Sequence, residues 1–461
     1  MTADDLLADA ATRARRYLAD IDDRSVAPSD EAVAGLSAFD EAVPDGPTDP
    51  ASTLALLDDA GSPATVATNA GRYFGFVTGA SYPAATASGW LAAAWDQNAA
   101  VEVMSPVAAT LDRVVGRWIV DLLDLPDGTG TSFVTGATMA NATGLAVGRD
   151  EVLGRHGWDV PARGLFGAPP LTVVVGAEAH STIAKSLALI GLGRDRVEVA
   201  PADEQGRIDA DHLPDVDGPV LVSAQAGNVN TGSFDPFDAL ADWVAERNGW
   251  LHVDGAFGLW ARAGVTTRHL TAGLARADSW ATDGHKWLNV SYDCGLALVA
   301  DQAALARTLA MQAAYLPDAD VELMNRTPQS SQRARAAEVW AVLRSLGRSG
   351  VADLIDRCCA HARHLAEGLA DAGHQVLNDV VLNQVLVRFG EPGDEGDATT
   401  DVVIGAIQAD GTCWCGPTTW HGQRAMRISV SSYATTDADI EASLAAIVRC
   451  AASLAPKGPV A

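Results

Sequence analysis

The sequence predicts an α/β fold with a mostly parallel sheet and helices on both faces. From residue 130 onward, short β-branched or apolar runs of strand length alternate with longer segments of helical periodicity. This alternation is typical of βαβ units, whose consecutive strands run parallel. Ligands bind beyond the carboxyl ends of the strands in such sheets, so a functional site is expected where the predicted strands end.

The elements follow in order along the chain. Residues 5–23 carry apolar side chains at helical spacing and predict an amphipathic helix. Residues 24–50, rich in Pro, Asp and Ser, predict a connector, and helices are predicted at 51–60 and at 86–123 with a break at Ser105-Pro106. The alternating region predicts helices at 139–153, from about 180, and at 237–248, and strands at 131–135, 171–175, 197–200, 219–224, 250–253, 278–282 and 295–299.

After about residue 300 the pattern changes to that of a smaller α+β domain. Helices are predicted at 333–346, 351–371, 399–409 and 437–453, and strands at 380–389 and 425–432. The sequence thus predicts an N-terminal helical arm (1–60), a large domain (61–316), a loop rich in Pro, Asp and Gln (317–332) and a C-terminal small domain (333–461).

Composition narrows the class of partner. The 461 residues have a formal net charge of -27, which argues against nucleic acid or an anionic membrane as a partner. The sequence has neither a secretory signal pattern nor an apolar run of membrane-spanning length, and the spacing of its six cysteines suits a reducing compartment, so we expect a cytoplasmic location. Cys358, His361 and His364 could share a helical face, but packed or surface residues explain them better, and no metal site is predicted.

Two predicted strand ends carry groups suited to an anion and to a flat ligand. After the strand at 131–135 the small residues Ala137 and Thr138 begin a helix, whose backbone N–H groups and dipole favour a phosphate. His180 follows the strand at 171–175, where its ring could stack on a planar ligand or cap the next helix.

Two further strand ends carry opposite charges. Asp254 ends the strand at 250–253, where a buried carboxylate requires a cationic partner. Lys286 follows the turn Asp283-Gly284 and is one of only three lysines, with Lys185 and Lys457. A chain that otherwise uses arginine places here an amine that can titrate, which arginine cannot supply.

These groups meet the needs of pyridoxal 5'-phosphate: a lysine for a Schiff base, an acid for the pyridine nitrogen and a seat for the phosphate. The rival for an α/β chain is a dinucleotide site. Its nearest glycine pair, Gly191 and Gly193, ends a helix and lacks the third glycine.

The chain resembles the group II pyridoxal-phosphate-dependent decarboxylases, from about residue 55 to its C-terminus. The resemblance rests on His252-Val253-Asp254-Gly255-Ala256 and on His285-Lys286-Trp287. It implies the aspartate aminotransferase fold, called fold type I, with a seven-stranded sheet in the large domain. It also implies that Lys286 carries the Schiff base and that Asp254 pairs with the pyridine nitrogen.

The resemblance extends to other site residues. It implies that His180 stacks on the cofactor ring, that Ala256 packs beneath it and that Ala137 and Thr138 hold the phosphate. It also places Asn228, Asp283 and His285 near the cofactor. Tyr315 falls where the family has a tyrosine on a mobile loop that reaches the partner subunit's active site, which implies a homodimer with shared sites.

Departures from the family pattern concern the substrate. The family's Gly-Thr-Thr is Gly227-Asn228-Val229 here, and Gly75 and Ala100 stand where aromatic amino acid decarboxylases carry aromatic side chains. The expected pocket is therefore roomier, or more polar, than in those enzymes. The residues predicted to line it are Phe74, Gly75, Phe76, Thr78, Asn98 and Ala100.

The activity expected from the resemblance is decarboxylation of an L-amino acid to its amine and CO2, with Tyr315, or His180 through a water, returning a proton to the α-carbon. An alternative is decarboxylation coupled to oxidative deamination, which yields an aldehyde; Tyr315 together with His180 disfavours it. Transamination, aldol cleavage and a non-catalytic relative of the fold are further alternatives.

Overall fold

The computed structural model describes residues 2–311 and 322–454, which divide into two compact units. The central unit comprises residues 79–363 and 377–385, and the terminal unit comprises residues 2–78, 364–376 and 386–454. The domain boundaries expected from the sequence stay a prediction. No helix in the described ranges is both long enough and apolar enough to cross a membrane.

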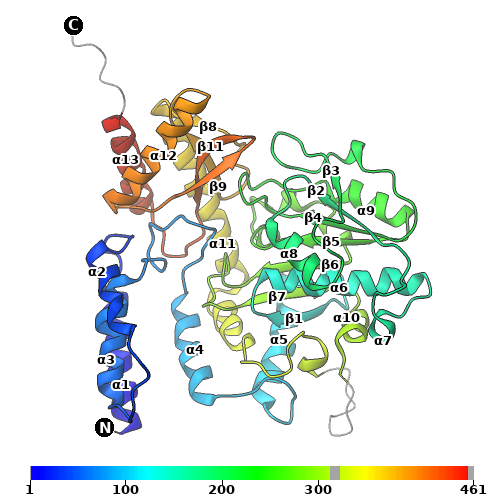
Figure 1. Ribbon diagram of the computed structural model, residues 1–461, viewed down its shortest axis with the longest axis horizontal. Helices are drawn as coiled ribbons and strands as arrows, with labels where there is room; N and C mark the ends of the chain where they lie inside the picture. Colours follow the sequence, from blue (N-terminus) through cyan, green and yellow to red (C-terminus); the bar gives the residue numbers. More distant parts are fainter. Residues whose placement is uncertain (1, 312–321, 455–461) are drawn as a thin grey trace. The chain divides into compact units, whose positions relative to one another are not determined.

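The central unit is built on a seven-stranded sheet with the order β1-β7-β6-β5-β4-β2-β3. Its strands β2 to β6 form parallel pairs, whereas β7 runs antiparallel to both β1 and β6. The predicted mostly parallel sheet is confirmed (Figure 1). The strands are β1 Gly130–Val134, β2 Thr172–Gly176, β3 Glu198–Ala200, β4 Val220–Gln225, β5 Trp250–Asp254, β6 Ser279–Asp283 and β7 Gly295–Val299.

Strand register brings the predicted site residues to one edge of this sheet. Asp254 pairs with Gln225 of β4 and with Ala281 of β6. Val134 of β1 and Asp283 of β6 both pair with Gly295 of β7. The carboxyl ends of β1, β4, β5 and β6 therefore lie at the same edge.

Helices flank the sheet, as predicted. Helix α6 packs across β4 to β7, and α9 packs on β4 and β5 (Figure 1). Side chains of α6, α8 and α10 share one buried apolar cluster with β2, β4, β5 and β7, which accounts for the all-apolar strand runs. The helices are α4 Pro83–Trp95, α5 Pro106–Leu122, α6 Ala137–Arg155, α7 Val160–Arg163, α8 Ser181–Leu189, α9 Phe237–Glu246 and α10 Gln302–Leu309.

The break predicted at Ser105-Pro106 is the start of α5, but the helix predicted before it is wrong over residues 96–105, because α4 ends at Trp95. The Ser105 hydroxyl accepts a hydrogen bond from the Ala108 N–H, and Pro106 occupies the first turn, where no N–H is required. Helix α11, Ala336–Asp371, begins in the central unit and ends in the terminal unit. The two helices predicted for this stretch are joined at Gly347, whose φ of 63° interrupts the helical backbone.

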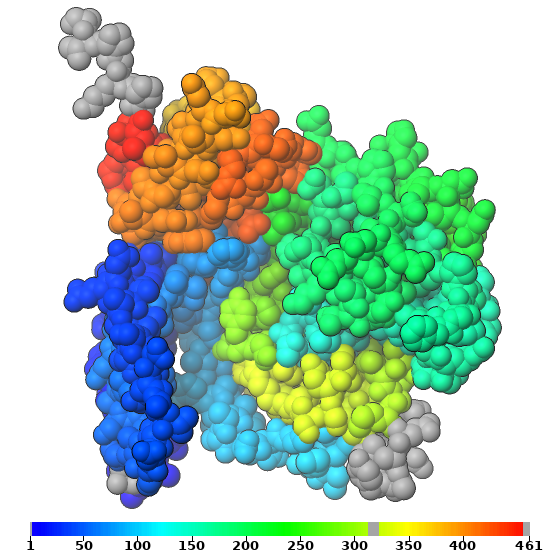
Figure 2. All heavy atoms as spheres, viewed as in Figure 1, coloured from blue at the N-terminus to red at the C-terminus, as the bar shows by residue number. Residues whose placement is uncertain are grey.

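The terminal unit includes helices α1, α2 and α3, whose atoms are blue in Figure 2, and α1 contacts α3. Arg13 of α1 joins them through Asp58 of α3 at 2.9 Å. This unit also contains a four-stranded sheet with the order β10-β11-β9-β8, on which α12 packs. Its elements are α1 Ala3–Asp20, α2 Asp30–Gly35, α3 Pro50–Gly61, β8 Gln375–Val376, β9 Gln384–Arg388, α12 Asp394–Asp410, β10 Gly416–Trp420, β11 Gln423–Ser429 and α13 Asp437–Leu454.

Candidate active site

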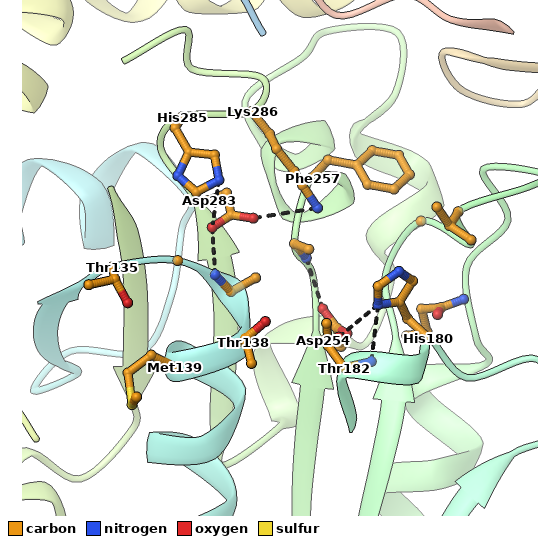
Figure 3. Close-up of a pocket in the computed structure, with 16 residues that line it drawn as sticks. Thr135, Thr138, Met139, His180, Thr182, Asp254, Phe257, Asp283, His285 and Lys286 are labelled. Carbon is orange, nitrogen blue, oxygen red and sulfur yellow. Dashed lines mark hydrogen bonds and ion pairs between the residues drawn. The ribbon is translucent and has the colours of Figure 1, made fainter. Parts of the chain in front are cut away.

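A cavity of about 360 Å³ lies at the carboxyl ends of the central unit's strands. Segments that follow β1, β2, β4, β5 and β6 line it, where ligands of parallel sheets are expected. Figure 3 shows side chains from these segments converging on the cavity. Its lining includes these residues predicted from the sequence: Ala137, Thr138, His180, Asp254, Ala256, Asp283, His285 and Lys286.

Lys286 extends its amine into this cavity from the turn after β6. Its Nζ lies 3.4 Å from Asp283 Oδ2, and its side chain is 21% exposed (Figure 3). The neighbouring Trp287 is fully buried, and the Asn289 amide donates a hydrogen bond of 3.3 Å to the Lys286 carbonyl. The protein thus fixes the lysine backbone while the amine stays accessible from the cavity.

His285, beside this lysine, holds its proton in a defined place. Its Nδ1 accepts the Cys294 N–H at 3.1 Å, so the proton of the neutral ring is on Nε2, which lies 3.5 Å from Asp283 Oδ1. Burial lowers the pKa of His285, and the Asp283 carboxylate opposes that shift. The ring also stacks on Tyr292 with centroids 4.3 Å apart.

The first turn of α6 forms one side of the cavity. Gly136, the N-cap residue, places no side chain over the helix start, and Thr138 lines the cavity. The Ala137 N–H donates a 2.5 Å hydrogen bond to Asp283 Oδ1. A β-carbon on Gly136 would approach His285 Cε1 to 3.1 Å, so glycine avoids a tight contact between the helix start and the His285 ring. Backbone N–H groups and the helix dipole there attract a phosphate.

Asp254 supplies a buried carboxylate opposite this helix start. It is 4% exposed, and its Oδ1 accepts the Ala256 N–H at 3.1 Å. Burial raises the pKa of Asp254, while the charges of His180 and Lys286 act to lower it. A carboxylate so buried stays ionised when a cation joins it from the cavity.

His180 both caps a helix and faces the cavity. It is the N-cap residue of α8, where its Nδ1 lies 2.7 Å from the Thr182 hydroxyl and accepts the Thr182 N–H at 3.3 Å. Its ring lies beside Asp254 (Figure 3). The two readings left open by the sequence are therefore compatible, because capping fixes the ring at the cavity wall.

Other predicted residues lie elsewhere. Asn228 is 1% exposed, and its Oδ1 accepts the N–H groups of Asn230 and Thr231, closing a loop. Its neighbours Gly227 and Val229 line the cavity instead. Tyr315 lies outside the described residues. The roles expected for Asn228 and Tyr315 stay predictions.

Of the residues predicted for the substrate side of the pocket, Asn98 and Ala100 belong to the central unit and are not among the residues that line the cavity, and the role of the whole set stays a prediction. Asn98 Oδ1 accepts the N–H groups of Ala100, at 3.1 Å, and Gln332, at 3.3 Å. These bonds make Asn98 a connector between its own segment and the one before α11. Phe74, Gly75, Phe76 and Thr78 belong to the terminal unit.

Gly75 is not beside open space. A β-carbon there would overlap the indole ring of Trp414, which also stacks on Tyr73 with centroids 5.2 Å apart and on Phe76 at 5.5 Å. Within the terminal unit, Trp414 therefore fills the volume next to Gly75. The sequence did not link these residues because they are far apart along the chain.

Sequence reasoning missed several lining residues, among them Thr182, Gln225 and Phe257. Each lies at a strand end or in the segment that follows one, so the rule that located Asp254 could have found them. No cluster of three or more His, Cys, Asp or Glu residues suited to a metal occurs within residues 2–311 and 322–454.

Comparisons with known proteins give concordant results. The pyridoxal-dependent decarboxylase conserved domain matches residues 45–389. Cysteine sulfinic acid decarboxylase of Mus musculus is 33% identical over 280 residues, covering 57% of this chain and 56% of the relative. L-2,4-diaminobutyrate decarboxylase of Rhizobium meliloti (strain 1021) is 32% identical over 317 residues, covering 64% and 59%. The chain thus spans less than two thirds of the length of these relatives.

The fold has solved counterparts. A crystal structure of Oryza sativa TDC with PLP and tryptamine superposes with a TM-score of 0.89 and covers 98% of this chain and 99% of that one. The two sequences are 21% identical, so the likeness concerns the fold. It confirms the fold expected from the sequence.

Proposed function

Because the chain belongs to the pyridoxal-dependent decarboxylase family, we propose that it removes CO2 from an L-amino acid and releases the corresponding amine, with pyridoxal 5'-phosphate as cofactor. One observation carries the proposal: the amine of Lys286, the carboxylate of Asp254 and the first turn of α6 surround a single cavity. The substrate is an amino acid by the same argument. The two curated relatives act on different amino acids, one named for cysteine sulfinic acid and one for diaminobutyrate.

The residues present fit this cofactor. The site offers an accessible amine, an anion seat that a β-carbon on Gly136 would narrow, and a buried carboxylate that lacks a close cationic partner among the described residues other than His180 and Lys286. A buried carboxylate is unfavourable without a cation, and the helix start favours an anion. A ligand that is anionic at one end and cationic at the other satisfies both. Pyridoxal 5'-phosphate has both ends and an aldehyde between them.

Lys286 would hold the cofactor covalently through Nζ, Thr138 and the first turn of α6 would bind its phosphate, and Asp254 would accept a hydrogen bond from its ring nitrogen. His180 and Ala256 would contact the two faces of the ring. When bound, the cofactor supplies the electron sink for the pair released as CO2 leaves.

The chain's own groups then determine orientation and protons. Asp254 stays ionised because its buried charge is compensated, and Asp283 holds the Lys286 ammonium near the cavity when the amine is free. His285, with its proton on Nε2 facing Asp283, keeps that carboxylate in place. Tyr315, or His180 through a water, returns a proton to the α-carbon.

Tyr315 falls where the family has a loop tyrosine that reaches the partner subunit's active site. We therefore also propose a homodimer with shared active sites. A cytoplasmic location is supported by the six cysteines, which are buried and unpaired. Sedimentation equilibrium tests the dimer, and a fully active monomer would contradict it.

The experiment that tests the function is a turnover assay with purified protein and added cofactor. L-amino acids with acidic, basic and aromatic side chains are supplied one at a time, and CO2, amine, aldehyde and dissolved O2 are measured together. Amine and CO2 in equal amounts, with no O2 consumed, support the proposal. Aldehyde formed with O2 uptake would instead indicate the oxidative reaction, and keto acid without CO2 would indicate transamination.

A further inference from the structure

Behind Asp254 lies a chain of buried polar side chains that the reaction does not use directly. The Trp250 indole N–H donates to Ser279 Oγ at 2.9 Å, and Ser279 Oγ lies 2.8 Å from His252 Nδ1. On the other side of the ring, His252 Nε2 lies 2.9 Å from Asn141 Oδ1. His252, Asn141 and Ser279 have essentially no solvent exposure.

This chain ends at Asp254. The Asn141 amide lies near enough to the carboxyl group to lower its pKa by hydrogen bonding. Asn141 Nδ2 forms no hydrogen bond that meets the distance and angle limits among the described residues. A buried amide NH2 group with no other hydrogen-bond partner in the described part of the chain therefore lies near the carboxylate predicted to bind the cofactor ring.

The donors and acceptors of these side chains fix which atom donates in each hydrogen bond of this network. An indole N–H can only donate, so Ser279 Oγ accepts from Trp250 and has its own proton to give to His252 Nδ1. The proton of His252 is then on Nε2 and is donated to Asn141 Oδ1. That bond turns the NH2 group of Asn141 toward Asp254.

The other tautomer of His252, with its proton on Nδ1, is unfavourable. A proton on Nδ1 of His252 would leave Nε2 as an acceptor, and the Asn141 amide would flip to satisfy it. The carbonyl oxygen of Asn141 would then face the Asp254 carboxylate, and two acceptors would meet in a buried site. The tautomer of His252 is thus linked to the charge of Asp254.

The fold holds the histidine ring in this position. On α6, a β-carbon at Gly144 would come within 2.7 Å of His252 Cε1 and Nδ1, so only glycine leaves space for the ring. Burial lowers the pKa of His252 to about 3, which keeps the ring neutral, with a single proton. A neutral ring that cannot move must adopt one tautomer or the other.

We propose that His252 is a positioning residue that, through its Nε2–H, orients Asn141 so that the amide NH2 group holds Asp254 as an ionised acceptor for the cofactor ring. The inference rests on the proposed function. Its ligand would be the protonated ring nitrogen of a pyridine bound in the cavity that Asp254 lines.

A purely structural network would need the histidine only for packing and for satisfied hydrogen bonds. The proposed role depends in addition on the donor at the Nε2 position. Glutamine can place an amide N–H near that position, whereas leucine fills similar volume without a donor. The pair His252→Gln and His252→Leu therefore separates the two roles.

The first measurement needs no cofactor. Histidine labelled with 15N in the full-length protein reports which ring nitrogen carries the proton, and the His252 signals are assigned by their loss in His252→Gln. A proton on Nε2 is expected. A proton on Nδ1 would overturn the proposal, because the Asn141 amide would then turn its carbonyl oxygen to Asp254.

The second measurement is the dissociation constant of pyridoxal 5'-phosphate, determined by equilibrium dialysis. His252→Leu and Asn141→Leu should each weaken binding by about tenfold or more, the effect typical of removing an outer partner of a ligand-binding group. The double variant should bind no more weakly than either single one, because both act through Asp254. His252→Gln should stay within about threefold of the unaltered protein.

The outcomes separate this inference from the proposed function. If His252→Leu binds the cofactor as tightly as the unaltered protein, the positioning role is wrong while the decarboxylase proposal stands. If the unaltered protein binds no cofactor, the proposed function fails, and the inference fails with it. Circular dichroism verifies that each variant is folded; if His252→Leu is not, the tautomer of His252 decides.

Discussion

Gly79 faces the backbone carbonyl of Lys286 so closely that a β-carbon on Gly79 would overlap the carbonyl oxygen. The backbone on which the lysine turn rests is thus shaped by a residue more than 200 positions earlier in the sequence. Asn289 donates to the same carbonyl at 3.3 Å. The position of the Lys286 amine therefore depends on a contact that no local motif reveals.

Replacing Gly79 by alanine should displace the lysine turn. We expect unfolding free energy to fall by about 1–3 kcal/mol, the range for an added group without space, and cofactor binding to weaken. Gly154→Ala on α6 is the matched control, because nothing lies within 4 Å of its β-carbon position. Urea unfolding and cofactor titration of both variants measure the difference, and equal behaviour would contradict the contact.

The side chains of the buried ion pair Asp112 and Arg326 should be strongly coupled, so that removing one partner alone destabilises the protein. Their atoms lie 2.8 Å apart, and the side chains are 2% and 7% exposed. Arg326→Met leaves a buried carboxylate without its partner and should cost about 3–5 kcal/mol. Asp112→Leu combined with Arg326→Met should recover most of this loss. Denaturant unfolding tests the cycle, and additive losses in the double variant would refute the coupling.

Acid should destabilise the unaltered protein more steeply than His252→Gln. Burial lowers the pKa of His252 from 6.5 to about 3, so between these values the unfolded chain binds a proton that the folded chain does not. Stability from this residue is fully present above pH 6.5 and is lost as pH falls toward 3. Between pH 6.5 and pH 5 the unfolding free energy of the unaltered protein, relative to that of His252→Gln, should fall by about 2 kcal/mol. If the unfolding free energies of the two proteins, measured by urea unfolding, fell in parallel with pH, the burial of a neutral His252 ring would be contradicted.

Gly75 and Trp414 should be coupled within the terminal unit. Gly75→Ala should cost about 1–3 kcal/mol because its methyl group meets the indole ring. In a Trp414→Ala background the same change should cost much less, because the ring is gone. Thermal unfolding of the four proteins gives the coupling free energy. A coupling near zero would show that the ring moves aside freely.

Much of the sheet could be predicted because its strands are buried and bounded by turn residues. The strand predicted at 295–299 is β7 itself, and the strand ends that carry Asp254 and Lys286 were located from local pattern. β10, Gly416–Trp420, was not predicted, because its glycine, proline and alternately exposed residues lack an apolar run. The two helices predicted at 333–346 and 351–371 are confirmed, because the backbone between them leaves the helical conformation at Gly347.

The site was predictable where a residue's chemistry is rare and local, as for Lys286 and Asp254. It was not predictable where function depends on a distant contact. The Gly79 contact with Lys286, the Trp414 ring beside Gly75 and the amide of Asn141 behind Asp254 all join segments far apart in the chain. Such contacts are set by packing, which a single sequence does not display.

Locating the covalently bound cofactor tests most directly whether Lys286 forms the Schiff base. The protein is incubated with pyridoxal 5'-phosphate, reduced with borohydride, digested and analysed by peptide mass spectrometry, with Lys286→Arg as control. Of the three lysines, Lys185, Lys286 and Lys457, only Lys286 should carry the reduced cofactor, and the control should carry none. Cofactor found on Lys185 or Lys457, or on no lysine, would contradict the central claim.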